Sequence, residues 1–160
     1  MRHMPVIRVD ADSCPRQVRD IIVRAAERTG ITVIFVANRP IPLKRSDSVN
    51  IRIVQNPGTT ADDVILYEAL PGDIIITRDI PLASRMLEKS CIVMNDRGLR
   101  FTTDTIRERL SLRDVMKEAR ETGLAEEGKR TFGRREVHAF AAELDRTLAE
   151  ILKNIREGRE

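Results

Sequence analysis

The sequence contains few cysteine, histidine and aromatic residues. Its 160 residues include two Cys, two His, no Trp, one Tyr and four Phe. Two cysteines cannot form a disulfide framework, and the lack of paired His or Cys spacings argues against a zinc site. With so few aromatic side chains there is little surface on which single-stranded bases could stack. Any binding of nucleic acid would therefore depend on contacts with phosphate groups.

Long apolar segments are also lacking. No run approaches the roughly 18 to 20 apolar residues that span a bilayer, and the N-terminus has no long apolar stretch of the kind found in secretory signals. We therefore expect a cytoplasmic protein with no membrane association. An apolar content of 41% over 160 residues is typical of one domain, or of a domain with an appendage. The net charge of +3 makes the chain mildly basic.

Five short apolar runs alternate with helical patterns in the first hundred residues. We expect strands at residues 6–9, 31–37, 49–54, 73–77 and 91–94. Helices are predicted to begin near Pro15, Thr60 and Pro81, where capping residues or proline precede apolar residues at helical spacing. The almost continuous apolar run at 31–37 is typical of a parallel sheet covered on both faces. The predicted fold class is therefore α/β, a three-layer sandwich with a mostly parallel sheet of about five strands.

Only helical patterns remain after Gly98. Helices are expected at about 105–110, 112–122 and 134–157. The last one has an apolar stripe that covers either the sheet of its own chain or the seam of a homodimer, and the sequence does not choose between them. The stripe consists of Val137, Phe140, Ala141, Leu144, Leu148, Ile151, Leu152 and Ile155. We divide the chain into an α/β domain, residues 1–122, and a C-terminal helical extension, residues 123–160, made of a linker and this long helix.

Aspartates follow the predicted strands at the ends where a parallel sheet binds its ligands. Asp10 follows the first strand, and Asp79 follows the strand at 73–77. Asp62 and Asp63 open the helix that comes after the strand at 49–54. Each aspartate could by itself be an ordinary cap or turn residue. Their convergence on one edge, however, would raise their pKa values unless a cation were present.

Mg²⁺ or Mn²⁺ is the cation that such a cluster predicts. All-oxygen ligation without His or Cys is typical of these two ions. The predicted metal ligands are Asp10, Asp12, Asp62, Asp63 and Asp79.

Three segments carry a resemblance to a known family. They are Asp10-Ala11-Asp12-Ser13-Cys14-Pro15, Thr60-Ala61-Asp62-Asp63 and the run from Gly72 to Ala83, which includes Thr77-Arg78-Asp79. In this order they are similar to the bacterial YaiI/YqxD family of uncharacterised proteins, which is grouped with PIN-like domains. The resemblance extends from Pro5 to Ile151 and includes Lys129-Arg130-Thr131-Phe132-Gly133.

The resemblance implies a PIN-like α/β sandwich. It also implies an activity, because the PIN-like proteins with intact acidic residues are Mg²⁺- or Mn²⁺-dependent ribonucleases. Asp10 matches the acid of the first strand, and Asp79 matches the acid after the threonine-containing strand. Asp63 or its neighbour Asp62 matches the acid at the helix start. A further acid of these nucleases, usually a glutamate on an intervening helix, has no clear counterpart here.

The leading hypothesis is a metal-dependent hydrolase of RNA phosphodiester bonds. Asp10, Asp63 and Asp79 would be the catalytic residues, because they would hold the ion that activates water and offsets charge on the phosphate. Six basic residues are candidates for contacts with the RNA backbone. They are Arg78, Arg39, Lys44, Arg45, Lys129 and Arg130.

Two other function classes remain open. Val9-Asp10-Ala11-Asp12 resembles the Asp-x-Asp opening of haloacid-dehalogenase-type phosphatases, in which Asp10 would be the nucleophile and Asp12 the general acid. The order of the later motifs counts against this class. The third class is a module that binds RNA or metal without turnover.

Overall fold

The structure is a computed structural model that describes residues 3–121 and 132–158. Its centre is a fully parallel sheet of five strands in the order β3-β2-β1-β4-β5. The strands are β1 (Ile7–Asp10), β2 (Val33–Ala37), β3 (Val49–Ile53), β4 (Ile74–Ile76) and β5 (Ile92–Met94). Each predicted strand is therefore confirmed, with ends that differ by one or two residues.

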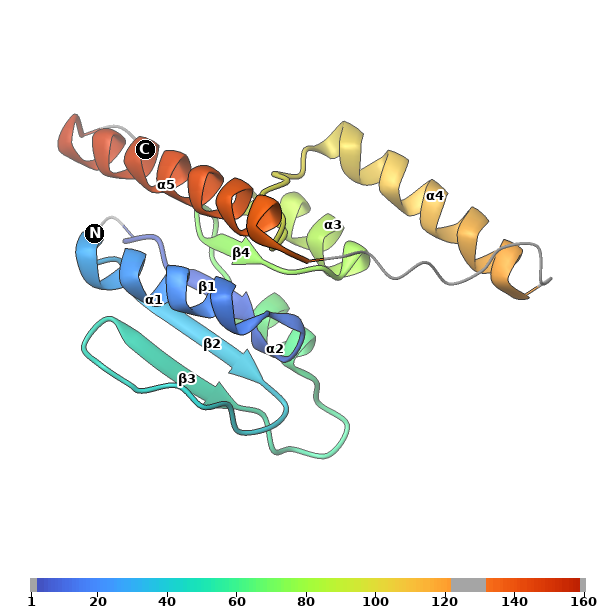
Figure 1. Cartoon of the computed structure of the whole chain (residues 1–160), viewed down its shortest axis with the longest axis horizontal. Helices are drawn as coiled ribbons and strands as arrows, with labels where there is room; N and C mark the ends of the chain where they lie inside the picture. Colours follow the sequence, from blue (N-terminus) through green and yellow to red (C-terminus); the bar gives the residue numbers. More distant parts are fainter. Residues whose placement is uncertain (1–2, 122–131, 159–160) are drawn as a thin grey trace.

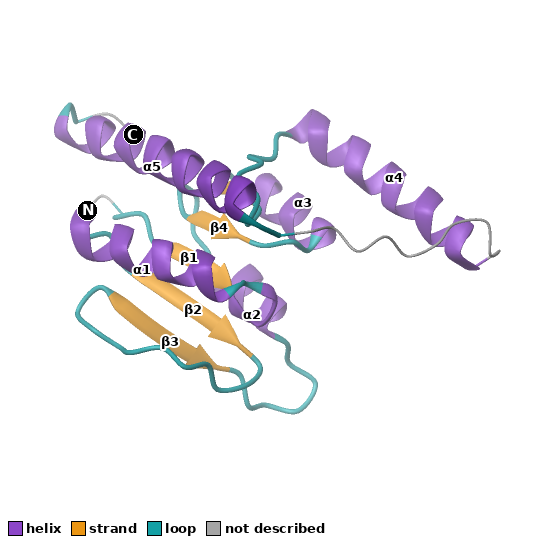
Figure 2. Ribbon diagram, in the orientation of Figure 1, coloured by secondary structure: helices purple, strands orange, loops and turns teal. Residues whose placement is uncertain are grey.

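Helices cover both faces of the sheet, which confirms the three-layer α/β sandwich and is consistent with a PIN-like architecture (Figure 2). The helices are α1 (Arg16–Thr29), α2 (Ala61–Glu68), α3 (Ile80–Glu88), α4 (Thr103–Glu121) and α5 (Arg134–Arg156), with a short 3-10 turn, η1 (Ala11–Ser13), after β1. α1 and α5 pack on one face, and α2, α3 and the start of α4 pack on the other. Ile7 and Val9 of β1 face the first pair, whereas the intervening Arg8 faces α2.

The long C-terminal helix covers the sheet of its own chain. Four members of its apolar stripe, Phe140, Leu144, Leu148 and Ile151, are buried in the same core as α1 (Figure 1). An ion pair between Arg28 of α1 and Asp145 of α5, 2.9 Å long, joins the two helices. The stripe therefore takes the first of its two predicted roles, because this part of it packs on the sheet of its own chain. A homodimer remains a prediction.

The helices after β5 differ from the prediction in one respect. The segments predicted at 105–110 and 112–122 form a single helix, α4, because neither glycine nor proline separates them. Among the described residues, no helix is long and apolar enough to cross a membrane.

The chain changes direction across the sheet between β1 and β4. It builds β1, β2 and β3 toward one edge, then returns to place β4 on the other side of β1. The carboxyl ends of two strands whose connections diverge in this way leave a crevice, which is where open α/β sheets bind ligands. Asp10 ends β1 and Thr77 follows β4, so both lie at this crevice.

Candidate functional site

Asp10 and Thr77 meet at the crevice between β1 and β4. Thr77 Oγ1 donates a hydrogen bond of 3.1 Å to Asp10 Oδ2, and Ser13 Oγ of the η1 turn lies 3.5 Å from the same oxygen. Thr77 Oγ1 also accepts the backbone N–H of Asp79 at 3.0 Å. This buried threonine therefore fixes the position of both aspartates at once.

Asp79 begins helix α3. Its Oδ1 accepts the backbone N–H of Leu82 at 2.8 Å, which makes it the N-cap residue, and Pro81 follows in the first turn. One carboxylate oxygen is thus used by the helix start. A capping role and a functional role are compatible in this residue.

Helix α2 brings the third carboxylate, and it is that of Asp62. Thr60 and Asp63 form a capping box, in which Thr60 N–H donates to Asp63 Oδ2 at 3.0 Å and Asp63 N–H donates to Thr60 Oγ1 at 3.2 Å. Asp63 is thereby turned back on its own helix start, where it lines an open groove beside β3. Asp62, one residue earlier, lies close enough to Asp10 and Asp79 to interact with both.

Burial and neighbouring acids raise the pKa values of Asp10 and Asp62. Burial, the charges of Asp10 and Asp79, and a hydrogen bond with the Asp79 side chain together raise the pKa of Asp62 to about 7. Burial raises the pKa of Asp10 as well, helped by the charges of Asp12 and Asp79 and opposed by the hydrogen bonds from Thr77 and Ser13. Such mutual repulsion indicates a site in which positive charge is lacking.

Asp12 lies beside the cluster but is held by Asn38, which follows β2. The backbone N–H and the Nδ2 of Asn38 approach Asp12 Oδ2 at 2.7 and 2.9 Å. Asn38 Oδ1 in turn accepts the N–H of Ala61 at 3.0 Å, at the start of α2. Asn38 thus joins η1 to α2 and sets the distance between Asp12 and Asp62. This role was not predicted from the sequence, although the position of Asn38 directly after a strand was a usable signal.

The cluster has the right donors for a divalent cation but is not a closed coordination sphere. Within residues 3–121 and 132–158, no three His, Cys, Asp or Glu side chains are arranged as a ready ligand set. Local donors hold one oxygen each of Asp10 and Asp79, so an ion at these carboxylates would be bound through their other oxygens. The all-oxygen donor set fits Mg²⁺ or Mn²⁺, both of which keep several waters.

The basic residues singled out from the sequence lie in different places. Arg39 is exposed next to Asn38 at the carboxyl edge of the sheet. Arg78 lies between Thr77 and Asp79 and pairs with Asp96. Arg45 donates to the carbonyl of Ile51 at 3.0 Å, which places it and the neighbouring Lys44 beside the edge strand β3 rather than at the strand ends. Lys129 and Arg130 lie outside the described residues.

Both cysteines are buried, as expected of structural residues. Burial and the nearby charge of Asp96 raise the pKa of the Cys14 thiol to about 12. Burial and the charge of Asp73 raise that of Cys91 to about 11. A thiol with such a pKa is protonated at neutral pH and is a poor nucleophile.

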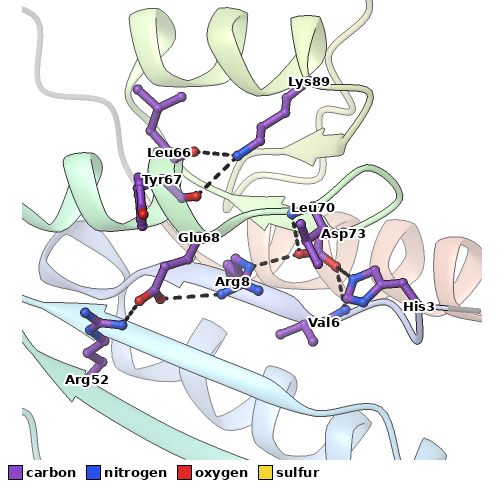
Figure 3. A network of polar contacts seen from close by, with 10 residues as sticks. All are labelled: His3, Val6, Arg8, Arg52, Leu66, Tyr67, Glu68, Leu70, Asp73 and Lys89. Atoms are coloured by element: carbon purple, nitrogen blue, oxygen red, sulfur yellow. Dashed lines mark hydrogen bonds and ion pairs between the residues drawn. The ribbon is translucent and has the colours of Figure 1, made fainter. Parts of the chain in front are cut away.

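A second polar network, in which the acids are neutralised, lies toward the opposite end of the sheet (Figure 3). Asp73, which is fully buried, accepts hydrogen bonds from His3 at 2.7 Å, from Arg8 Nε at 2.9 Å, and from the backbone N–H groups of Val6 and Leu70 at 3.0 and 2.9 Å. Glu68, at the end of α2, bridges Arg8 and Arg52. This network ties β1, β3, β4 and α2 together.

Comparison with known proteins shows close relatives along nearly the whole chain. Residues 8–150 match a family described as uncharacterised, the YaiI/YqxD family. The UPF0178 protein YE1167 of Yersinia enterocolitica is 42% identical over 145 residues, which cover 91% of this chain and 95% of that protein. A UPF0178 protein of Treponema pallidum is 46% identical over 148 residues, covering 92% and 84% of the two chains. No solved structure matches the chain.

Proposed function

The chain belongs to the YaiI/YqxD family, and we propose that it is a Mg²⁺- or Mn²⁺-dependent hydrolase of RNA phosphodiester bonds. The observation that carries this proposal is the meeting of Asp10, Asp62 and Asp79, from three different elements, at the crevice between β1 and β4. The burial and like charge that raise the pKa values of Asp10 and Asp62 destabilise the fold, and this cost is offset when a cation binds.

Each residue of the cluster has a distinct task in this proposal. Asp10, held by Thr77, and Asp79, held by the start of α3, present oxygens from fixed backbone positions. Asp62 gives up its proton on metal binding and supplies the third carboxylate. When bound, the ion supplies a Lewis acid that polarises the attacking water and offsets charge on the phosphate. Asp12 and Asp63 keep one oxygen free for water-mediated contacts at the rim.

The reaction is the attack of water on a phosphodiester phosphorus. The oxygen of water forms a bond to phosphorus, and the bond from phosphorus to one ribose oxygen breaks. The leaving oxygen takes up a proton, so that one product strand ends in a phosphate and the other in a hydroxyl group. Arg39, exposed at the same edge, and Arg78 are placed to hold the charged backbone of the strand. The substrate roles of Lys44, Arg45, Lys129 and Arg130 remain predictions.

The geometry favours this reaction over a phosphatase of the haloacid-dehalogenase type. That chemistry requires Asp12 to donate a proton to the leaving group. In the structure Asp12 Oδ2 accepts two hydrogen bonds from Asn38, which tie its side chain to the end of β2 and limit its movement toward a leaving group. Trapping of a phosphorylated Asp10 would support the phosphatase.

A cleavage assay with end-labelled RNA tests the proposal. The wild type, Asp10→Asn and Asp20→Asn are each incubated with RNA in the presence of Mg²⁺, Mn²⁺ or EDTA. Asp20 is an exposed residue of α1 outside the cluster and serves as the control. We expect metal-dependent cleavage by the wild type and Asp20→Asn, with a loss of about 100-fold or more in Asp10→Asn. Equal cleavage by Asp10→Asn contradicts the assignment, and binding of RNA without cleavage by the wild type supports the module without turnover.

A further inference from the structure

A cavity lined by three arginines lies next to the aspartate cluster. It has a volume of about 420 Å³ and is bounded by the start of α3, the loop after β5 and the first half of α4. Arg78, Arg97 and Arg109 line it together with Asn95 and Asp96. Ligand pockets commonly have volumes of roughly 300 to 1,000 Å³, so the cavity is large enough for a group such as a nucleoside monophosphate.

The charge of this cavity is positive. Arg78 Nε donates to Asp96 Oδ2 at 2.6 Å, and Arg97 lies 3.6 Å from Glu136 and over the ring of Phe132. Arg109, which is half-buried, forms no ion pair or hydrogen bond with any residue that the structure describes. Arg78 and Arg97 have acidic partners, so the guanidinium charge that a bound anion would balance is that of Arg109.

A second observation also indicates a ligand. Asp96 is 3% exposed, and its Oδ1 has no hydrogen-bond partner among the described residues. A buried, unpaired carboxylate oxygen is costly and calls for a donor from a ligand or a water molecule. The loop that carries Asp96 is held in place, because Asn95 Oδ1 accepts the N–H groups of Arg97 and Leu99 at 3.0 and 2.9 Å. The oxygen is therefore not left unpaired by a loose loop.

The cavity lies beside the end of β1, where Asp10 of the aspartate cluster is located. Arg78 and Asp96 also line a small hollow whose other walls include Asp10, Ser13 and Thr77. Arg78 thus stands between the two sites, with Thr77 on one side and the other two arginines across the cavity. A strand that reached the aspartates would bring a neighbouring phosphate toward the arginines.

We propose that this cavity binds the phosphate group of a nucleotide. Guanidinium groups match phosphate because their planar N–H donors pair with two oxygens at once. That the phosphate belongs to the RNA strand rests on the proposed function, whereas the binding of a phosphate group does not.

Isothermal titration in buffer with EDTA tests the cavity independently of metal and cleavage. The probes are inorganic phosphate, adenosine 5′-monophosphate and a short single-stranded RNA. The proteins are the wild type, Arg109→Gln, Arg109→Lys and the control Arg107→Gln, an exposed position of α4 that does not line the cavity. Thermal unfolding confirms that each variant is folded.

We expect Arg109→Gln to weaken binding of the mononucleotide by about tenfold or more, the effect of losing one charge-assisted hydrogen bond. Arg109→Lys keeps the charge and should lose less, and Arg107→Gln should bind as the wild type does. A parallel loss for the RNA identifies a phosphate of the strand, and a loss for the mononucleotide alone identifies a free nucleotide. Equal binding by Arg109→Gln and Arg107→Gln, or no binding of any probe by the wild type, overturns the proposal. Asp10→Asn should keep phosphate binding. The proposal that the cavity binds phosphate can therefore be supported even if the nuclease assay shows no cleavage.

Discussion

Buried or half-buried aspartates occur at both ends of the same sheet, in opposite electrostatic states. At the amino end, burial alone would raise the pKa of Asp73, but hydrogen bonds from Leu70 N–H, His3, Val6 N–H and Arg8 outweigh it and hold the pKa below its usual value. At the carboxyl end, burial and neighbouring acids raise the pKa values of Asp10 and Asp62.

The difference between the two ends is the supply of donors and positive charge. Asp73 has Arg8 as a buried partner, and this pair links β1 to β4. Among the residues that the structure describes, no arginine or lysine forms an ion pair with Asp10 or Asp62, and Arg78, the nearest in sequence to Asp79, is engaged by Asp96. The amino end is therefore built for stability, and the carboxyl end is left with a charge that a ligand can compensate.

Asp73→Asn should have the largest effect, on stability. The substitution leaves Arg8 buried with only Glu68, 3.8 Å away, as a nearby acid. We expect the free energy of unfolding to fall by about 3 kcal/mol, as is usual when one partner of a buried ion pair is removed. Urea denaturation followed by circular dichroism measures the change. A loss below about 0.5 kcal/mol would show that the network is not structural.

The affinity for Mn²⁺ should depend on pH through Asp62. Because its pKa is raised to about 7, the carboxyl group must lose a proton before it can bind a cation. The affinity should rise up to about tenfold per pH unit below pH 7 and level off above it. Titrations at pH 6, 7 and 8 measure this rise, which Asp62→Asn should flatten. If the affinity of the wild type for Mn²⁺ did not change with pH, Asp62 would not be a metal ligand.

Asp62→Asn should have the smallest effect, and of opposite sign to that of Asp73→Asn. A raised pKa in the folded state means that stability is full below the unfolded-state pKa and is lost as pH rises through about 7. The neutral variant escapes this loss, so at pH 8 it should be as stable as the wild type or slightly more stable. At pH 4, close to the ordinary value of 3.8, the carboxyl group is protonated in the folded state and to a large extent in the unfolded chain, so the difference should be small. Denaturation at the two pH values measures this difference. If the variant were less stable than the wild type at pH 8, the neighbouring acids would not be destabilising the ionised Asp62 carboxylate.

Local patterns in the sequence predict most of the fold. β-branched runs predict all five strands, and Thr60 and Gly30 mark a helix start and a helix end as expected. The convergence of aspartates on one edge follows from the parallel topology alone. The topology does not determine whether Asp62 or Asp63 joins the cluster. Successive residues of a helix point about 100° apart, and the rotation of α2 is set by tertiary packing.

The features that the sequence does not predict depend on contacts between residues far apart in the chain. The bond between Asn38 and Asp12 joins residues 26 positions apart, and the pair of Arg8 and Asp73 joins residues 65 positions apart. Arg109 reaches the cavity from α4, far along the chain from Arg78. Such contacts depend on how layers pack, and no local periodicity encodes them.

The central claim is that the carboxyl-edge aspartates bind a divalent cation, and titration calorimetry with Mn²⁺ at pH 8 tests it most directly. The variants are Asp10→Asn, Asp79→Asn and the control Asp20→Asn. Asparagine can still accept the bond from Thr77 at position 10 and still cap α3 at position 79, so the fold is retained. The account predicts binding by the wild type and Asp20→Asn and a loss of about tenfold or more in the other two. Unchanged binding in Asp10→Asn and Asp79→Asn, or no binding by the wild type, would contradict it.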